Sequence, residues 1–266
     1  EDPDLADLSA LLKRRTTWRE QAGALLMDQA EGRLFRNAEG ALALEVTEPG
    51  LARSCVSEAM VLAGAAMAEW SAEKQLAMPY RVQPGSIENT PNAEHWPQGP
   101  VRWAQQRRGL SRSRLQARPE PHVSLGLPMY LQWTSPIRRY SDLLAHRQWL
   151  LYSGHLDGEP LSAEAISALL QRLDQGQREA SLIARQDQRL ALLEWLSGPT
   201  SQWPQAGIVL SWLREDLGIA LVRIEAWAME LPVQVEGQLG LGDELAVHLD
   251  RIDIATDQLR LKGKVG

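Results

Sequence analysis

Apolar residues recur every three to four positions near the start of the chain and again after residue 50. This period is typical of α-helices with one buried face, and it predicts helices over about 4–30 and 51–74. A third helix is expected over 135–152, because its opening Ser-Pro pair suits a helix cap and first turn. A fourth is expected over 162–196, where Ser-Gly-Pro ends it.

Strand-like patterns are rare before residue 200 and dominate after it. Alternating residues predict one early strand over 41–46, and repeated prolines make 79–100 an extended loop region. After residue 204 the chain carries five short apolar or alternating segments, which are 206–210, 217–224, 229–235, 244–252 and 258–262. Five such strands in about 60 residues predict a small OB-type barrel. We therefore expect an α+β chain with domains 1–200 and 204–266.

The composition is that of an ordinary soluble protein, with 44% hydrophobic and 23% charged residues among 266. No apolar run approaches the roughly 18 residues that span a bilayer. The acidic N-terminus does not resemble a signal peptide, so we expect a cytoplasmic protein without a membrane partner. The single cysteine, Cys55, excludes an internal disulfide and leaves either a small buried hydrophobe or a functional thiol.

The net charge of −6 argues weakly against a nucleic-acid partner, but the charge is unevenly distributed. Six arginines and no acidic residue fall between 101 and 118: Arg102, Arg107, Arg108, Arg112, Arg114 and Arg118. An acidic protein can bind RNA if its basic residues line one channel. This arginine run therefore predicts either a route for a single strand or a solvated basic face.

One long segment carries a specific motif. It reads His-Val-Ser-Leu-Gly-Leu-Pro-Met-Tyr over 122–130, Thr-Ser-Pro-Ile-Arg-Arg-Tyr-Ser-Asp over 134–142 and His-Arg at 146–147. The segment resembles the signature of the RNase II (RNB) exoribonuclease family, and the Glu-Pro pair at 48–49 and Glu-Ala-Met at 58–60 extend the resemblance. The barrel lies where that family carries an S-one-type RNA-binding domain. The resemblance implies the C-terminal half of an RNB catalytic domain followed by that barrel.

The resemblance also implies an activity. Family members degrade single-stranded RNA hydrolytically from 3′ to 5′, releasing nucleoside 5′-monophosphates with Mg²⁺. The catalytic arginine of the family maps onto Arg138, whose guanidinium would stabilise charge on the phosphate. A purely structural alternative is an ion pair between Arg138 and Asp142, one helical turn on.

Further residues of the motif could contact RNA, and each has a structural alternative. Arg139 would hold the backbone or pair with an acid, and Thr134 and Ser135 would donate to phosphate or cap the helix. Tyr140 would stack on RNA or pack in the core. Arg147 is expected to bind RNA beside an Asp142–His146 pair.

Glu58 is the second residue that the resemblance carries over with a role. The family's glutamate at this position contacts the ribose near the RNA 3′ end, and a carboxylate accepting from a 2′-OH favours RNA over DNA. The alternative is a solvated helix carboxylate.

One departure from the family stands out. The family's metal site is a cluster of aspartates in an Asp-x-Asp-Asp-Ala-type stretch, and nothing in this sequence matches it. We therefore expect no metal ligand in this chain and Mg²⁺ ligands outside it, in the N-terminal portion of the same protein. Two alternatives are a subunit whose partner carries the aspartates and a relative that binds RNA without cleaving it. An unrelated helical enzyme with a barrel would require the match over 134–142 to be accidental.

Overall fold

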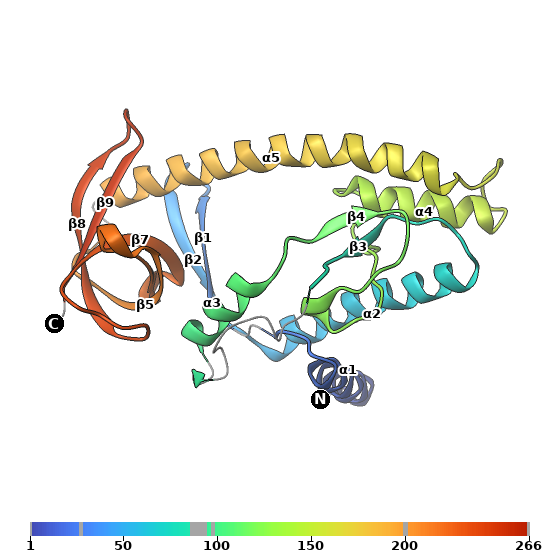
Figure 1. The fold of residues 1–266 in the computed structure, drawn as a ribbon, viewed down its shortest axis with the longest axis horizontal. Coiled ribbons are helices and arrows are strands. Elements are labelled where there is room, and N and C mark those ends of the chain that lie inside the picture. Colours follow the sequence, from blue (N-terminus) through green and yellow to red (C-terminus); the bar gives the residue numbers. More distant parts are fainter. Residues whose placement is uncertain (1, 27–28, 86–94, 97–98, 199–201, 265–266) are drawn as a thin grey trace. The chain divides into compact units, whose positions relative to one another are not determined.

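The computed structural model describes residues 2–26, 29–85, 95–96, 99–198 and 202–264 (Figure 1). The chain forms two compact units that interleave along the sequence. Unit 1 comprises the described parts of Glu1–Leu26, Gly50–Asn89 and Gly109–Glu179. Unit 2 comprises those of Met27–Pro49, Thr90–Arg108 and Ala180–Gly266. The domain limits 1–200 and 204–266 stay a prediction.

Unit 1 is mainly helical. Its helices are α1 (Pro3–Gln21), α2 (Leu51–Glu73), α4 (Tyr140–Tyr152) and the first part of α5 (Ala163–Ser197). Two short antiparallel strands, β3 (Tyr80–Val82) and β4 (Arg114–Gln116), and the 3₁₀ turn η3 (Val123–Leu125) complete it. Side chains from α2, the segment between α2 and β3, β3, the segment before α4 and α4 itself form its main core: Ala68, Leu76, Met78, Tyr80, Val82, Leu131 and Ala145.

Unit 2 contains a closed five-stranded barrel in the order β5-β6-β7-β9-β8 (Figure 1). Its strands are β5 (Gln205–Arg214), β6 (Ile219–Ile224), β7 (Met229–Glu236), β8 (Glu244–Asp253) and β9 (Gln258–Lys264). All neighbouring strands are antiparallel except β7 and β9, which are parallel. The predicted α+β class and its barrel are confirmed.

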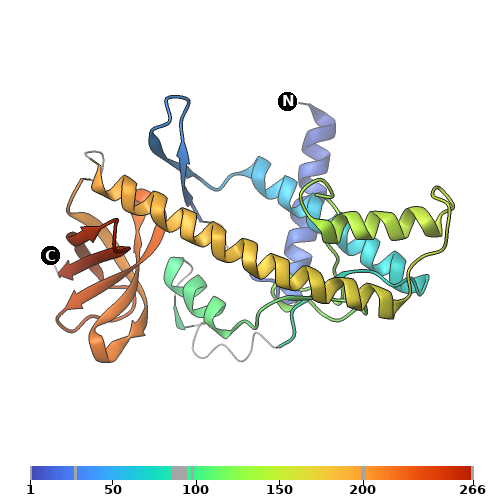
Figure 2. The same ribbon diagram turned by 90° about the horizontal axis from the view of Figure 1, so that it is seen from above.

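Unit 2 also contains β1 (Glu31–Arg36) and β2 (Leu42–Thr47), most of α3 (Pro100–Gly109) and the second part of α5. The hairpin of β1 and β2 packs partly buried leucines against the barrel core. Helix α3 donates from Gln105 Nε2 to the Leu210 carbonyl (2.7 Å). Helix α5 is one continuous helix that begins in unit 1 and ends in unit 2 (Figure 2). Within unit 2, Trp195 of α5 packs edge-on against Trp227.

Two predicted helices have different limits in the structure. The first ends at Gln21 rather than near residue 30, because Gly23 takes a left-handed conformation (φ 90°) that continues no helix. The third begins at Tyr140 rather than Ser135, because Arg139 is extended (φ −126°, ψ 118°). Residues 136–138 form a turn in which the N–H groups of Arg138 and Arg139 donate to the Ser135 carbonyl.

Helix α2 is long and apolar enough to cross a membrane by length and composition, whereas no such stretch was expected from the sequence. One helix of this kind is weak support for a membrane span, because the core helix of a soluble protein passes the same criterion. Helix α2 also carries Glu58, whose carboxylate is engaged by arginines of α1.

Candidate nucleic-acid interface

The loop before α4 is fixed by one buried carboxylate. Asp142 is fully buried, and its Oδ2 accepts from the Ser135 backbone N–H (2.8 Å) and from Arg139 Nε and Nη2 (3.1 and 2.7 Å). Its Oδ1 accepts from Ser141 Oγ (3.1 Å). Charge-assisted bonds of this kind are about twice as strong as neutral ones, so Asp142 ties both ends of the loop to α4.

Arg138 lies on the exposed side of this loop. Among the residues that the structure describes, its side chain forms no hydrogen bond or ion pair. The alternative of an Arg138–Asp142 pair is therefore wrong, and the acid partner belongs to Arg139. Asp142 holds the chain on either side of Arg138 while leaving this guanidinium free.

The other predicted residues of the loop are also placed by the structure. Thr134 and Tyr140 are exposed, as is Arg147 on α4, while Ser135 is half-buried. The capping role is wrong, because the helix cap is Arg139 and no side chain bonds there. Core packing of Tyr140 is also wrong, because this residue is 47% exposed. The RNA contacts of these residues stay predictions.

The expected pair between Asp142 and His146 is absent from the described contacts. His146 Nε2 instead lies 2.8 Å from the Trp133 carbonyl oxygen, and its ring stacks on the Trp133 indole with centroids 3.9 Å apart. One face of Trp133 is therefore covered by protein.

Glu58 is buried within unit 1 rather than solvated, so the solvated alternative is wrong. Arg19 Nε donates to its two oxygens (3.0 and 3.1 Å), Arg19 Nη2 donates to Oε2, and Arg15 Nε lies 3.5 Å from Oε1. Arg19 Nη1 also donates to the Leu125 carbonyl (3.0 Å). A ribose hydroxyl could reach this carboxylate only by displacing an arginine, so the predicted ribose contact stays a prediction.

Arg15 and Arg19 were not among the residues predicted from the sequence. Their spacing of four residues places both on one face of α1, and that spacing is the signal that could have found them. It does not identify their partner, which lies on another helix.

The arginine run over 101–118 is divided between the two units. Arg107 of unit 2 pairs with Glu230 of the barrel, with Nη2 and Oε1 2.6 Å apart. Arg114 of unit 1 pairs with Glu120 (3.5 Å). Two of the six arginines thus have acid partners, which the sequence pattern did not indicate. The route for RNA along the run stays a prediction.

Two buried groups of unit 1 have shifted acidities. Burial, and secondarily the charge of Arg81, lowers the pKa of His122 to about 4. Burial raises the pKa of Tyr80 to about 12. His122 is therefore neutral at physiological pH and adds no positive charge to the motif.

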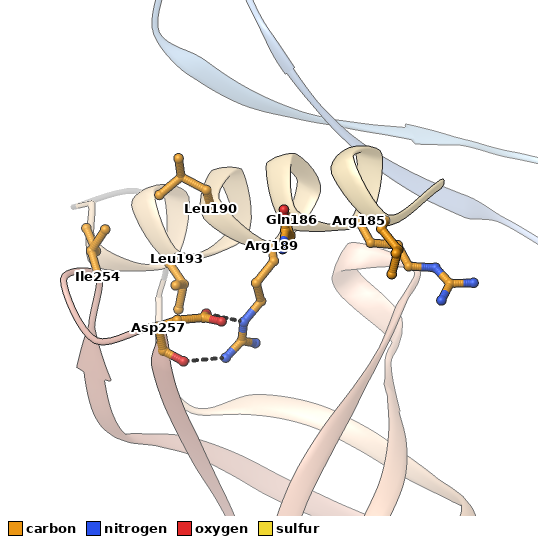
Figure 3. Close-up of a pocket in the computed structure, with 8 residues that line it drawn as sticks. Arg185, Gln186, Arg189, Leu190, Leu193, Ile254 and Asp257 are labelled. Carbon is orange, nitrogen blue, oxygen red and sulfur yellow. Dashed lines mark hydrogen bonds and ion pairs between the residues drawn. The ribbon is translucent and has the colours of Figure 1, made fainter. Parts of the chain in front are cut away.

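A groove in unit 2 lies between α5 and the turn joining β8 to β9 (Figure 3). Its lining residues are Leu182, Arg185, Gln186, Arg189, Leu190, Leu193, Ile254 and Asp257. Arg189 Nε bonds to Asp257 Oδ1 (2.8 Å) at its edge (Figure 3). Four of its eight lining residues are aliphatic, and none of them is a predicted site residue.

Mg²⁺ requires several oxygen ligands, usually carboxylates and water. Within the described ranges, no group of three or more His, Cys, Asp or Glu side chains could hold a metal ion. The described residues therefore offer no cluster of several carboxylates for a metal ion.

Comparison with known proteins decides the family. Residues 1–153 match the model of the RNB domain. The chain belongs to the RNB domain family. An uncharacterized ribonuclease of Synechocystis is 34% identical over an alignment of 264 residues that covers 98% of this chain and 39% of that relative.

Solved RNB structures share the fold. The Dss1 exoribonuclease of Candida glabrata aligns with 98% of this chain and 35% of its own, at a TM-score of 0.80 and 17% identity. RNase R of Mycoplasma genitalium, in complex with ribose methylated single-stranded RNA, aligns with 97% of this chain and 49% of its own, at a TM-score of 0.78 and 16% identity. This chain therefore spans less than half the length of each of these RNB relatives.

Proposed function

We propose that this chain is the C-terminal part of a hydrolytic exoribonuclease that degrades single-stranded RNA from 3′ to 5′ and releases nucleoside 5′-monophosphates. The observation that carries the proposal is the loop before α4, in which Asp142 engages Arg139 and leaves Arg138 exposed and uncommitted. Membership of the RNB family and relatives named as ribonucleases support the same activity.

Arg138 is the catalytic residue in this proposal. Hydrolysis of a phosphodiester places extra negative charge on a five-coordinate phosphorus, and fixed cations must stabilise that charge. A guanidinium keeps its charge and offers planar donors that match two phosphate oxygens. Arg138 has no partner to give up within the described chain, so its donors are available to the substrate. The residues that would position the RNA lie in the same segment: Arg139, Thr134, Ser135, Tyr140 and Arg147.

Mg²⁺ would neutralise part of the phosphate charge, bound by ligands outside this chain. These ligands belong to an aspartate-bearing portion, which we place in the preceding part of the same protein. The barrel would bind RNA upstream of the cleaved bond. A cytoplasmic place of action is part of the same proposal.

Glu58 would contact the terminal ribose only after Arg15 or Arg19 releases its carboxylate. This condition ties the ribose contact to a local rearrangement of α1. Substitution of Arg138 needs no such rearrangement, so it tests the proposed activity more directly.

The first experiment identifies the whole polypeptide by intact mass and N-terminal sequencing, and then measures decay of 5′-labelled single-stranded RNA with Mg²⁺. We expect stepwise shortening from the 3′ end with nucleoside 5′-monophosphates as products. Arg138→Ala should lower the rate by about 10³-fold, by analogy with arginines that stabilise phosphoryl transfer. Arg178→Ala, which removes an exposed arginine of α5, is the matched control and should retain the rate.

The result also separates the two classes of function. A whole protein that binds single-stranded RNA but never shortens it would contradict the nuclease. The alternative of a non-catalytic RNA-binding module would then replace it.

A further inference from the structure

Arg81 is a half-buried arginine without an acid partner. It is the middle residue of β3, and its backbone N–H donates to the Tyr130 carbonyl (2.8 Å). Its Nε donates to Ser113 Oγ (3.1 Å), and no carboxylate of the described chain lies within ion-pair distance of its guanidinium. A guanidinium has five N–H donors, so one hydroxyl leaves most of its hydrogen-bonding capacity unused.

The segment that carries Arg112 is tied to β3 by the residues on either side of Arg112. The Ser111 carbonyl accepts from Gln83 Nε2 (2.8 Å), and the Ser113 hydroxyl accepts from Arg81. Both contacts tie the segment around Arg112 to the β3 side of the hairpin. The Arg112 side chain itself is exposed.

Arg112 and Arg139 both act on Arg81 through their positive charges. Burial lowers the pKa of Arg81, and the positive charges of Arg112 and Arg139 lower it further, whereas Asp174 opposes them. Asp174 pairs with Arg178, with Oδ2 and Nη2 2.5 Å apart, so its charge is already shared. The charge of Arg139 is likewise shared with Asp142, so among the described residues Arg112 supplies the uncompensated positive charge that acts on Arg81.

We propose that Arg81 and Arg112 form a binding site for a backbone phosphate of single-stranded nucleic acid. Two like-charged guanidinium groups repel, and a bound phosphate offsets that repulsion while accepting their free donors. Arg139, whose charge also acts on Arg81, belongs to the loop that presents Arg138, so the site would hold a strand beside the proposed catalytic residue. The phosphate site deepens the proposed function and rests on it for the identity of the strand as RNA.

A binding measurement tests the site without relying on cleavage. A short fluorescein-labelled oligouridylate is titrated with the full chain in EDTA, by fluorescence anisotropy at several salt concentrations. Arg81→Gln and Arg112→Gln should each weaken binding about tenfold, as expected for loss of a hydrogen bond to a charged group. Each should also flatten the slope of log affinity against log salt by about 0.7, the value for one phosphate contact of a single strand.

Two further binding measurements identify the chemical group that the site binds. Oligodeoxythymidylate should show the same relative losses, because DNA and RNA share the backbone phosphate. Arg172→Gln removes an exposed arginine of α5 that lies outside the run over 101–118, and it should bind like the wild type. Losses confined to oligouridylate, or an equal loss for Arg172→Gln, would overturn the site.

The remaining outcomes separate the phosphate site from the proposed function. If the wild type binds oligouridylate and the folded Arg81→Gln and Arg112→Gln variants bind equally well with the same salt slope, only the phosphate site fails. Circular dichroism and thermal unfolding establish that the variants are folded. If the wild-type chain binds neither oligonucleotide, the phosphate site fails and RNA binding by this chain fails with it.

Discussion

Arg19 and Glu58 form a buried ion pair that joins α1 to α2. Their exposed fractions are 4% and 3%, and Arg19 engages both carboxylate oxygens as well as the Leu125 carbonyl. The pair therefore links two helices and the 3₁₀ turn η3. Glu58 thus has a structural role that is independent of any ribose.

Neutralising Glu58 should destabilise the protein. Glu58→Gln leaves the Arg19 guanidinium buried without a countercharge, and breaking a buried pair from one side costs about 3–5 kcal/mol. We expect the free energy of unfolding to fall by that amount in urea denaturation, with little change in the dependence on urea.

Two comparisons isolate the cause of that loss. The double variant Arg19→Met with Glu58→Met should be more stable than Glu58→Gln, because it removes both buried charges together. Glu194→Gln, which breaks an exposed pair with Arg36, should cost under about 1 kcal/mol. Wild-type stability for Glu58→Gln would contradict the structural role.

Substitutions of Asp142 and Arg138 should have different effects on the stability of the protein and on its activity. Asp142→Asn weakens the bonds to Ser135 and Arg139, so the free energy of unfolding should fall by about 3 kcal/mol and RNA decay should slow. Arg138→Ala should slow RNA decay while changing the unfolding free energy by less than about 0.5 kcal/mol, because Arg138 is exposed. Urea denaturation and RNA decay are measured on the same preparations. A large stability loss for Arg138→Ala would show that the residue is structural.

Gly64 should tolerate no side chain. A Cβ there would lie 2.3 Å from the Leu131 carbonyl oxygen and 2.5 Å from Tyr130 Cε2, so α2 packs directly against the 130–131 segment. We expect Gly64→Ala to lower the free energy of unfolding by about 1–3 kcal/mol through overpacking. Gly176→Ala, in open space on α5, should instead raise it by about 0.5–1 kcal/mol. A stabilising Gly64→Ala would contradict this packing.

Local periodicity was sufficient for much of the fold. The helix predicted over 162–196 is α5, and all five barrel segments are strands. Strand β5 continues to Arg214 rather than 210, because bulges in its pairing with β6 interrupt the alternation that marks a strand. Strand β1 was missed because most of its residues are exposed, which leaves little apolar alternation in the sequence.

The motif correctly indicated the loop of the candidate site. The helical spacing of four residues, however, predicted Arg138 as the partner of Asp142, which is wrong. A helix beginning at Ser135 would place Arg138 one turn from Asp142. The helix begins at Tyr140 instead, and Arg139 takes the bond. Contacts between separate elements, such as Arg19 with Glu58, have no local pattern, so the sequence alone could not indicate them.

His122 should make folding less stable in acid. Its folded pKa is about 4, chiefly because of burial, against the ordinary value of 6.5, so below pH 6.5 the unfolded chain binds a proton that the folded chain does not. The resulting loss of stability begins near pH 6.5 and reaches about 3 kcal/mol near pH 4. In urea denaturation from pH 7 to pH 4, His122→Asn should lose less stability than wild type. Parallel pH curves for His122→Asn and wild type would mean that His122 is protonated as readily in the folded protein as in the unfolded chain.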